Sequence, residues 1–198
     1  MSKGSAQLIL IVFFIATSFI FFITIPLMII YYNQMNKKKN RVDFSYSGMD
    51  VQLNKRHDLI PNLVESVKKI MSHETDLFSS ITALRSKIWE VNPKSEGRLE
   101  MEGQLSSMLG SLQVTMENYP EIKSDENMLQ LQRALNETEE QVSASRRAYN
   151  ASVLNLTDAL TTFPSNIFGA AMDINLQSYY QAPEGSRANP QVGNLFGS

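Results

Sequence analysis

The chain offers few side chains that commonly carry out metal or nucleophilic chemistry. His57 and His73 are its only histidines, and it contains no cysteine. On one helix the two histidines would lie about 24 Å apart at roughly 1.5 Å per residue, too far to share a metal ion. The sequence has neither the Glu-x-x-His spacing of di-iron bundles nor the His-Glu-x-x-His motif of zinc proteases. We therefore expect no metal and no cofactor.

Other enzyme motifs are also missing from the sequence. It has no glycine-rich phosphate-binding loop and no Gly-x-Ser-x-Gly nucleophile turn. Because cysteine is absent, disulfides, thiolate metal ligands and cysteine nucleophiles are excluded. The net charge of −2 gives no electrostatic basis for binding nucleic acid. We expect a protein that is neither an enzyme nor a nucleic-acid binder.

One group of polar residues interrupts an apolar helical pattern in the first part of the chain. Arg56, with Asp58 close by, lies on a line of mostly apolar residues that are spaced three or four apart. Pro61 follows one turn later and lacks the backbone donor that would bond the carbonyl of His57. Glu74 lies further along the same line. A buried charge needs a partner, so Arg56 either joins an interhelical ion pair or belongs to a patch that recognises a partner protein.

A second polar group lies later in the chain, where Arg146 precedes Tyr149 and Asn150. The same two interpretations apply to it: an interhelical layer that fixes the helix register, or a recognition patch. For Glu74, a polar layer or a solvated helix face is the simpler interpretation. We consider these residues as structural or partner-binding candidates: Arg56, Asp58, Pro61, Glu74, Arg146, Tyr149 and Asn150.

An uncharged apolar segment precedes both groups. The 25 residues from Leu8 to Tyr32 carry no charge and span roughly 37 Å as a helix, enough to cross a hydrocarbon core of about 30 Å. A cleaved signal peptide would have a shorter apolar region of about 7–15 residues, so we expect a permanent anchor. A basic cluster follows the segment, at Lys37, Lys38, Lys39 and Arg41. This cluster predicts a cytoplasmic location for the rest of the chain and an external N-terminus.

The remaining pattern predicts an all-α bundle of long helices. Apolar residues alternate in steps of three and four, which is the 3.5-residue repeat of coiled-coil-like packing. We expect one helix over 43–89 with a kink at Pro61, then helices over 98–118, 125–162 and 165–180. The expected core residues of the second and fourth helices include Met101, Leu105, Met108, Leu112, Met116, Ile167, Phe168 and Tyr179, and the line of the third helix ends at Phe163.

The predicted organisation has four parts. They are a short N-terminal segment over 1–7, a transmembrane helix over 8–32, a four-helix bundle over 33–181 and a flexible tail over 182–198.

Several motifs follow one another in a specific order. The longest is Arg56-His57-Asp58-Leu59-Ile60-Pro61-Asn62-Leu63-Val64. The others are Gln52-Leu53, His73-Glu74, Tyr119-Pro120 with Lys123, Leu131 to Glu139, Arg146 with Tyr149-Asn150, and Phe163-Pro164-Ser165-Asn166. Over roughly residues 31–169 the chain thereby resembles the LemA family of bacterial membrane proteins. The resemblance implies a membrane-anchored helical bundle, and it implies no particular biochemical activity.

These observations predict a non-enzymatic, single-pass protein of the bacterial cell membrane that assembles with copies of itself into a cytoplasmic scaffold. Residues 37–69 include eight basic and four acidic ones, which favours contact with anionic membrane lipid, although a mixed solvated surface is the alternative. Gly103 and Gly110 in the second bundle helix favour close packing in a homo-oligomer. The alternative function is an adaptor or regulator that binds another membrane protein, such as a membrane protease, as the family resemblance suggests.

Overall fold

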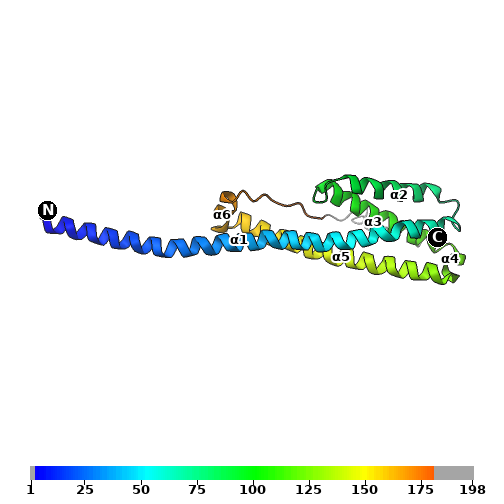
Figure 1. The fold of residues 1–198 in the computed structure, drawn as a ribbon, viewed down its shortest axis with the longest axis horizontal. Coiled ribbons are helices and arrows are strands. Elements are labelled where there is room, and N and C mark those ends of the chain that lie inside the picture. The colour runs from blue at the N-terminus through cyan, green and yellow to red at the C-terminus, as the bar shows by residue number, and fades with distance from the viewer. Residues whose placement is uncertain (1–2, 181–198) are drawn as a thin grey trace, which may run out of the picture. The chain divides into compact units, whose positions relative to one another are not determined.

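The computed structural model describes residues 3–180, in which all regular secondary structure is helical (Figure 1). The elements are α1 (Lys3–Lys68), α2 (Thr75–Glu90), α3 (Glu96–Met116), α4 (Pro120–Ser124), α5 (Glu126–Thr161) and α6 (Ser165–Ala171). The predicted all-α class is confirmed, and a four-helix arrangement within it stays a prediction. The predicted tail over 182–198 lies outside the described residues.

The described chain forms two compact units. Residues 3–43 and 152–177 make up the first unit, and residues 44–151 and 178–180 make up the second unit. α1 and α5 each contribute residues to both units.

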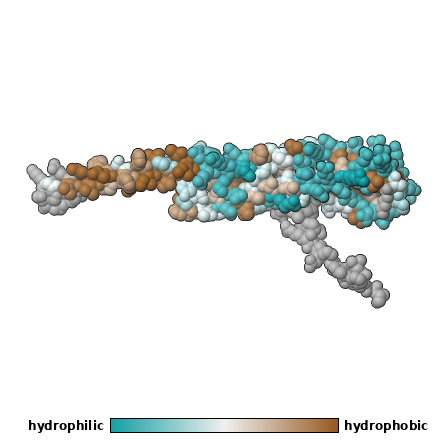
Figure 2. Space-filling view, turned by 90° about the horizontal axis from the view of Figure 1, so that it is seen from below, coloured by the Kyte–Doolittle hydropathy of each residue, from teal (hydrophilic) through white to brown (hydrophobic). Residues whose placement is uncertain are grey.

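The N-terminal part of α1 exposes an apolar surface, which Figure 2 shows as the brown stretch. Large side chains along it are mostly uncovered, as for Phe22, which is 81% exposed. From Leu10 on, α1 contains a segment long and apolar enough to cross a membrane, and none of that segment is buried. It is the one helix of this kind in the part of the chain that the structure describes. The predicted span over 8–32 coincides with this exposed surface.

α1 ends at Lys68, so the predicted single helix over 43–89 is wrong. Residues 69–74 form a turn segment between α1 and α2. Lys68 in the last turn of α1 and Asp76 in the first turn of α2 are favourable end and start signals. The apolar spacing continues across the break because Met71, inside the turn segment, is fully buried. The apolar spacing therefore predicted one continuous helix, whereas the charges at Lys68 and Asp76 indicated that one helix ends and another begins there.

α1 continues through Pro61 although this residue has no backbone donor. Proline leaves the carbonyl of His57, one turn earlier, without its helical hydrogen bond. Arg85 of α2 replaces the missing donor, because its Nε donates to the His57 carbonyl oxygen at 2.9 Å. A side chain from a neighbouring helix thus pairs a backbone acceptor that the proline leaves open.

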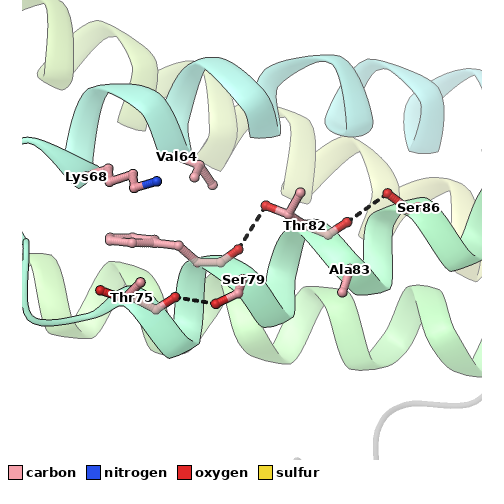
Figure 3. Close-up of a pocket in the computed structure, with 8 residues that line it drawn as sticks. Val64, Lys68, Thr75, Ser79, Thr82, Ala83 and Ser86 are labelled. Atoms are coloured by element: carbon pink, nitrogen blue, oxygen red, sulfur yellow. Dashed lines mark hydrogen bonds between the residues drawn. The ribbon is translucent and has the colours of Figure 1, made fainter.

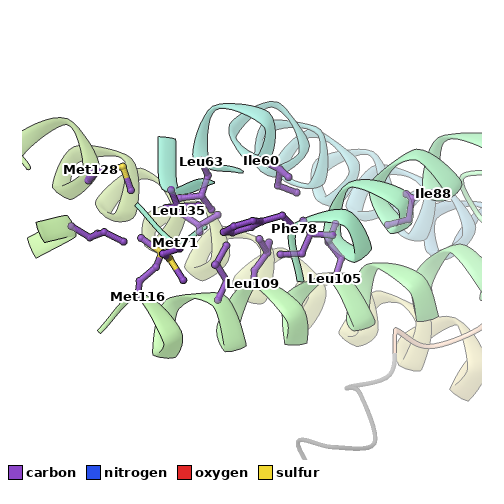
Figure 4. Close-up of a cluster of buried hydrophobic side chains, with 14 residues drawn as sticks. Ile60, Leu63, Met71, Phe78, Ile88, Leu105, Leu109, Met116, Met128 and Leu135 are labelled. Atoms are coloured by element: carbon purple, nitrogen blue, oxygen red, sulfur yellow. The ribbon is translucent and has the colours of Figure 1, made fainter. Parts of the chain in front are cut away.

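The core of the second unit draws on side chains from α1 to α5 and from the turn after α1 (Figure 4). Its buried members are Ile60, Leu63, Val67, Met71, Phe78, Ile81, Ile88, Leu105, Leu109, Leu112, Met116, Ile122, Met128 and Leu135. Full burial of one such side chain contributes about 1.5–3 kcal/mol, so this cluster dominates the stability of the unit. In α3 the apolar line is shifted from the predicted one: Leu109 is buried, whereas Met101 and Met108 are only half-buried.

Side-chain caps determine where α3 and α5 begin. The Ser95 hydroxyl accepts the backbone N–H three residues later at 3.2 Å. One carboxylate oxygen of Asp125 accepts the N–H groups of Asn127 and Met128 at 2.9 and 3.1 Å. Between them, α4 begins at Pro120, where a missing N–H costs nothing because the first turn of a helix has no internal acceptor for it. α5 begins at Glu126, one residue after the predicted start.

In the first unit, α6 packs on α1. The rings of Phe168 and Tyr31 stack with their centroids 5.2 Å apart and an interplanar angle of 10°. Gly169 is buried, and a Cβ at this position would overlap the side chain of Leu160 and lie 3.5 Å from the Met35 methyl. Glycine therefore allows the close approach of α6 to the end of α5.

α6 ends at Ala171, so the predicted helix over 165–180 is too long. Asp173 has a φ of 50°, the left-handed conformation that commonly ends helices. Its N–H and that of Ile174 bond back to carbonyls of the preceding turn, at 3.3 and 3.2 Å. These two bonds complete a Schellman-type end, which composition alone did not reveal because asparagine or glycine is the usual residue there.

Several apolar residues expected to be buried near α6 are exposed instead. Phe163 is 76% exposed, Ile167 is 57% exposed and Tyr179 is 39% exposed. Phe163 lies in the turn between α5 and α6, and Tyr179 lies beyond the end of α6 at Ala171, so neither residue continues a helical core line.

We expect Pro61 and Arg85 to be energetically coupled. In the parent, Arg85→Met leaves the His57 carbonyl without its donor and lowers the free energy of unfolding by about 1–3 kcal/mol. Pro61→Ala supplies the missing N–H, so Arg85→Met should have a much smaller effect in that background. Urea unfolding of all four proteins in detergent, followed by circular dichroism, measures the coupling. Equal losses in the two backgrounds would contradict it.

Candidate functional site

Arg56 is the centre of a buried ion-pair network in the second unit. Its fully buried guanidinium lies 2.5 Å from a carboxylate oxygen of Glu102 on α3 and 2.9 Å from one of Glu139 on α5. It also donates to the hydroxyl of Ser106, which in turn donates to Glu139 at 2.9 Å. One charged side chain thereby joins α1, α3 and α5.

His57 extends the network from the next position on α1. Its Nε2 lies 2.9 Å from the second carboxylate oxygen of Glu102, and both side chains are fully buried. Because Glu102 accepts as a carboxylate, this nitrogen carries the hydrogen and donates. The imidazole ring also packs on Trp89 of α2, with centroids 5.4 Å apart. His57 therefore helps to hold Glu102 in place rather than facing solvent.

Arg98 and Asp50 lie at the edge of the network. Nη2 of Arg98 is 3.1 Å from the Asp50 carboxylate, and its Nε is 3.8 Å from Glu102. Its guanidinium also lies 5.9 Å from the ring centroid of Trp89. Glu102 is thus shared among two arginines and one histidine.

Charge pairing keeps the network ionised. Burial raises the pKa of Glu102, but the hydrogen bond from His57 and the charge of Arg56 outweigh burial and hold that pKa below its usual value of 4.5. Burial likewise lowers the pKa of Arg56, and the charges of Glu139 and Glu102 more than reverse this effect. Breaking a buried pair of this kind costs about 3–5 kcal/mol. The network therefore disfavours any register of α1, α3 and α5 in which Arg56 misses its carboxylates.

The geometry of this site suits structure better than catalysis. Arg56, His57 and Glu102 have no exposed surface, so a substrate has no route to them. Within residues 3–180, no group of three His, Asp or Glu side chains is arranged to hold a metal ion.

A surface cavity of about 410 Å³ lies between α1 and α2 (Figure 3). Hydroxyl groups along it already donate to carbonyls of α2: Ser79 to Thr75 at 2.5 Å, Thr82 to Phe78 at 2.8 Å and Ser86 to Thr82 at 3.1 Å. These bonds already use the hydroxyl hydrogens of Ser79, Thr82 and Ser86, so these hydroxyls are not free to donate to a ligand in the cavity.

Comparison with known proteins bears on the region that contains the network. The model of the LemA family matches residues 45–193, which is most of the chain. The chain belongs to the LemA family. It is 23% identical over 183 residues to Protein LemA of Metamycoplasma hominis, an alignment that covers 89% of this chain and 84% of that protein. The LemA-matched region begins after the apolar segment of α1 and includes every residue of the Arg56 network.

The LemA motif around Arg56 contains buried and exposed residues. Asp58 is exposed, and it lines a shallow cavity of about 350 Å³ instead of joining the network. Pro61 is also exposed, and its structural effect is the open carbonyl of His57. Glu74 is half-buried at the N-cap of α2, where its side chain forms no capping hydrogen bond. Of the four candidates in this part of the chain, only Arg56 belongs to the buried network.

The other three candidates bind a C-terminal segment of the same LemA-family chain. The Asn150 amide donates to the carbonyl of Tyr180 and accepts its N–H, both at 2.9 Å. The Tyr149 hydroxyl donates to the carbonyl of Ser178 at 3.0 Å, and Arg146 lies 5.0 Å from the centroid of the Tyr180 ring. Burial raises the pKa of Tyr180 to about 12, so its phenol stays neutral. These contacts attach a non-helical segment to α5.

Sequence reasoning missed Glu102 and Glu139, the carboxylate partners of Arg56, and Arg85, the donor to the His57 carbonyl, although the two glutamates had a signal. Glu102 lies three residues before Leu105, a predicted core residue of α3. It is therefore a charged residue at core spacing, as Arg56 is on α1. Glu139 is the last residue of the Leu131 to Glu139 motif in the family resemblance. Arg85 had no signal, because its role depends on α2 lying against α1, which the expected continuous helix excluded.

Removing Arg56 is expected to destabilise the second unit strongly. Arg56→Ala removes the closest cation from the buried carboxylate of Glu102 and leaves it only His57 and Arg98, and breaking a buried pair costs about 3–5 kcal/mol. Arg56→Met keeps the packing of the stem but removes the same cation, so it should be equally harmful, and adding Glu102→Gln should restore part of the loss. Thermal melting in detergent compares these variants with Arg133→Ala, an exposed control on α5. A melting temperature of Arg56→Ala within about 2 °C of the parent would contradict this role.

The stability that Glu102 contributes is expected to disappear in acid. Its pKa is lower in the folded chain than its usual value of 4.5, so the unfolded chain takes up the proton first as the pH falls. The contribution is complete above about pH 4.5 and is lost as the pH falls through the folded-state pKa. Urea unfolding at a series of acidic pH values should show a shallower loss for Glu102→Gln than for the parent. Glu100→Gln, at an exposed site on α3, is the control; a parent-like slope for Glu102→Gln would contradict the linkage.

Proposed function

We propose that this LemA-family chain is a single-pass membrane protein whose helical region forms a self-assembling scaffold at the cytoplasmic face of a bacterial cell membrane. The observation that carries the proposal is the apolar run from Leu8 to Tyr32, most of whose large side chains are uncovered. A continuous apolar surface of this length is unfavourable in water and is compatible with lipid. The anchor also explains why α1 extends well before the LemA-matched region begins at residue 45.

The basic residues after the apolar run support the cytoplasmic orientation. Lys37, Lys38, Lys39 and Arg41 follow it, whereas Lys3 is the only basic side chain before it. A cluster of this size resists translocation and is attracted to the anionic lipids of the inner leaflet.

One face of α3 supports contact between copies. The helix carries no charged residue between Glu102 and Glu117, although several side chains there are exposed. Gly110 lies on this face in open space, since a Cβ added to it would meet no neighbouring atom within 4 Å, and Val114 is 65% exposed. Small uncharged side chains let a second helix approach closely, so α3 suits a helix–helix interface.

The polar chemistry of the second unit also favours assembly over catalysis. Arg56 pairs with Glu102 and Glu139, and solvent does not reach the centre of their network. Such a network resists deformation of α1, α3 and α5, which suits a building block that must keep its shape in an assembly.

The proposed orientation predicts the labelling pattern of two engineered cysteines. The natural chain has no cysteine, so Ser5→Cys and Ser186→Cys each introduce a single reactive site. In intact cells an impermeant maleimide should label residue 5 and not residue 186, because the basic cluster keeps the C-terminal part inside. Lysed cells, in which both sites should react, are the control. Labelling of residue 186 and not residue 5 would show the opposite orientation.

Self-assembly through α3 is expected to be sensitive to bulk at Gly110. Gly110→Leu should reduce particle size in mild detergent without lowering the melting temperature, because leucine favours a helix over glycine by up to about 1 kcal/mol. Gly97→Leu, at another open glycine of α3, is the matched control. Native mass spectrometry reports the assembly of each protein. An unchanged particle for Gly110→Leu would exclude this face, and a monomeric parent would favour an adaptor of another membrane protein over a scaffold.

A further inference from the structure

The chain from the end of α5 through α6 exposes apolar side chains in an uncharged segment. No charged residue occurs between Asp158 and Asp173. Within this segment Phe163 is 76% exposed and Ile167 is 57% exposed, although α6 is packed on α1 through its other side. Two large apolar side chains within one short uncharged segment form a surface that water does not favour.

The packing of α6 on α1 relates this surface to the predicted membrane boundary. Phe168 stacks on Tyr31, the penultimate residue of the apolar run. Gly169 lies against Met35, one turn later and just before the basic cluster that starts at Lys37. α6 therefore lies against the stretch of α1 where the apolar run gives way to positive charge.

Polar groups beside α6 fit the same boundary. A cavity of about 220 Å³ is lined by Gln34 and Lys38 of α1, by Asp158 near the end of α5 and by Ser165 at the start of α6. Lys38 also donates to the carbonyl of Asn155 at 3.2 Å. Along α1, the contact with α6 at Tyr31 is followed within about two helical turns by the polar and cationic groups at Gln34 and Lys38. A bilayer has the same order, from acyl chains to headgroups.

We propose that α6 and Phe163 lie in the membrane interface, where Phe163 and Ile167 insert among the lipids as a second contact beside the transmembrane part of α1. The inference rests on the membrane anchor of the proposed function and adds the place where the helical region contacts the same bilayer. Lipid is the favoured occupant over a second copy because α6 stacks on Tyr31 at the end of the apolar run, which places the exposed side chains at the predicted membrane boundary. Interfacial segments of this kind bury apolar side chains about 5–10 Å deep, at the boundary of headgroups and acyl chains.

Single fluorescent labels on the full-length protein test this position. Cysteine variants labelled with an environment-sensitive dye are reconstituted in phosphatidylcholine vesicles that contain phosphatidylglycerol. Nitroxide-labelled phosphatidylcholines then quench the dye, with the nitroxide near either the glycerol or the chain end. The sites are Ile167→Cys in α6, Phe19→Cys in the anchor and Leu154→Cys as the aqueous control. Leu154 is 51% exposed and adjoins Asn155, which Lys38 contacts beyond the apolar run.

The expected result is a loss of emission at residue 167 that is stronger with the shallow nitroxide than with the deep one. Residue 19 should show the reverse order, and residue 154 should keep its emission with both. If residue 167 behaves like residue 154 while residue 19 is quenched, the interfacial position is wrong and the anchor stands. Blue-shifted emission at residue 167 without nitroxide quenching would also overturn the proposal, since a second protein copy would then cover this surface. If residue 19 is not quenched, the anchor itself is wrong, and the inference fails with it.

Discussion

The second unit depends on one buried charge. Arg56 lies on a core line of α1, where an unpaired guanidinium would cost far more than the few kcal/mol that separate a folded chain from an unfolded one. Glu102 from α3 and Glu139 from α5 remove this penalty, and His57 and Arg98 complete the coordination of Glu102. The ion pairs, at 2.5–2.9 Å, add a directional constraint that non-directional apolar burial does not supply. Packing supplies the stability of the unit, and the charge determines its alignment.

A backbone defect near the same point adds a second constraint. Pro61 opens the carbonyl of His57, and Arg85 from α2 closes it. α2 is therefore attached to α1 one residue from Arg56. In the motif that the LemA resemblance rests on, the residues with the clearest effects are an arginine that needs carboxylates and a proline that needs a donor. Both create an unsatisfied group on α1 that only other helices can satisfy, which makes the motif a device for assembling helices.

In the first unit, several large apolar side chains are exposed rather than buried. In the second unit the predicted core residues are mostly buried, whereas around α6 the predicted core residues Phe163 and Ile167 are exposed. Such exposure is unfavourable in water, and it is reasonable at the place where α6 stacks on Tyr31 at the end of the apolar run. The same hydrophobic effect thus accounts for burial in the helical region and for the proposed contact of α6 with lipid.

The sequence by itself determined the helical class, the long apolar run, the LemA resemblance and the fact that Arg56 needed a partner, because these follow from local spacing and the cost of burying a charge. It also predicted the start of α5 to within one residue, because the caps and acids that begin a helix act over only a few residues. Only the tertiary structure decided that α1 ends at Lys68 and that Glu102 and Glu139 are the partners of Arg56. It also decided that Arg85 bonds the His57 carbonyl, and that Arg146, Tyr149 and Asn150 hold Ser178 and Tyr180. A regular three-and-four spacing is the same for a continuous helix and for two helices joined by a turn with a buried Met71. The choice between them depends on contacts between residues far apart in the chain, which local patterns do not encode.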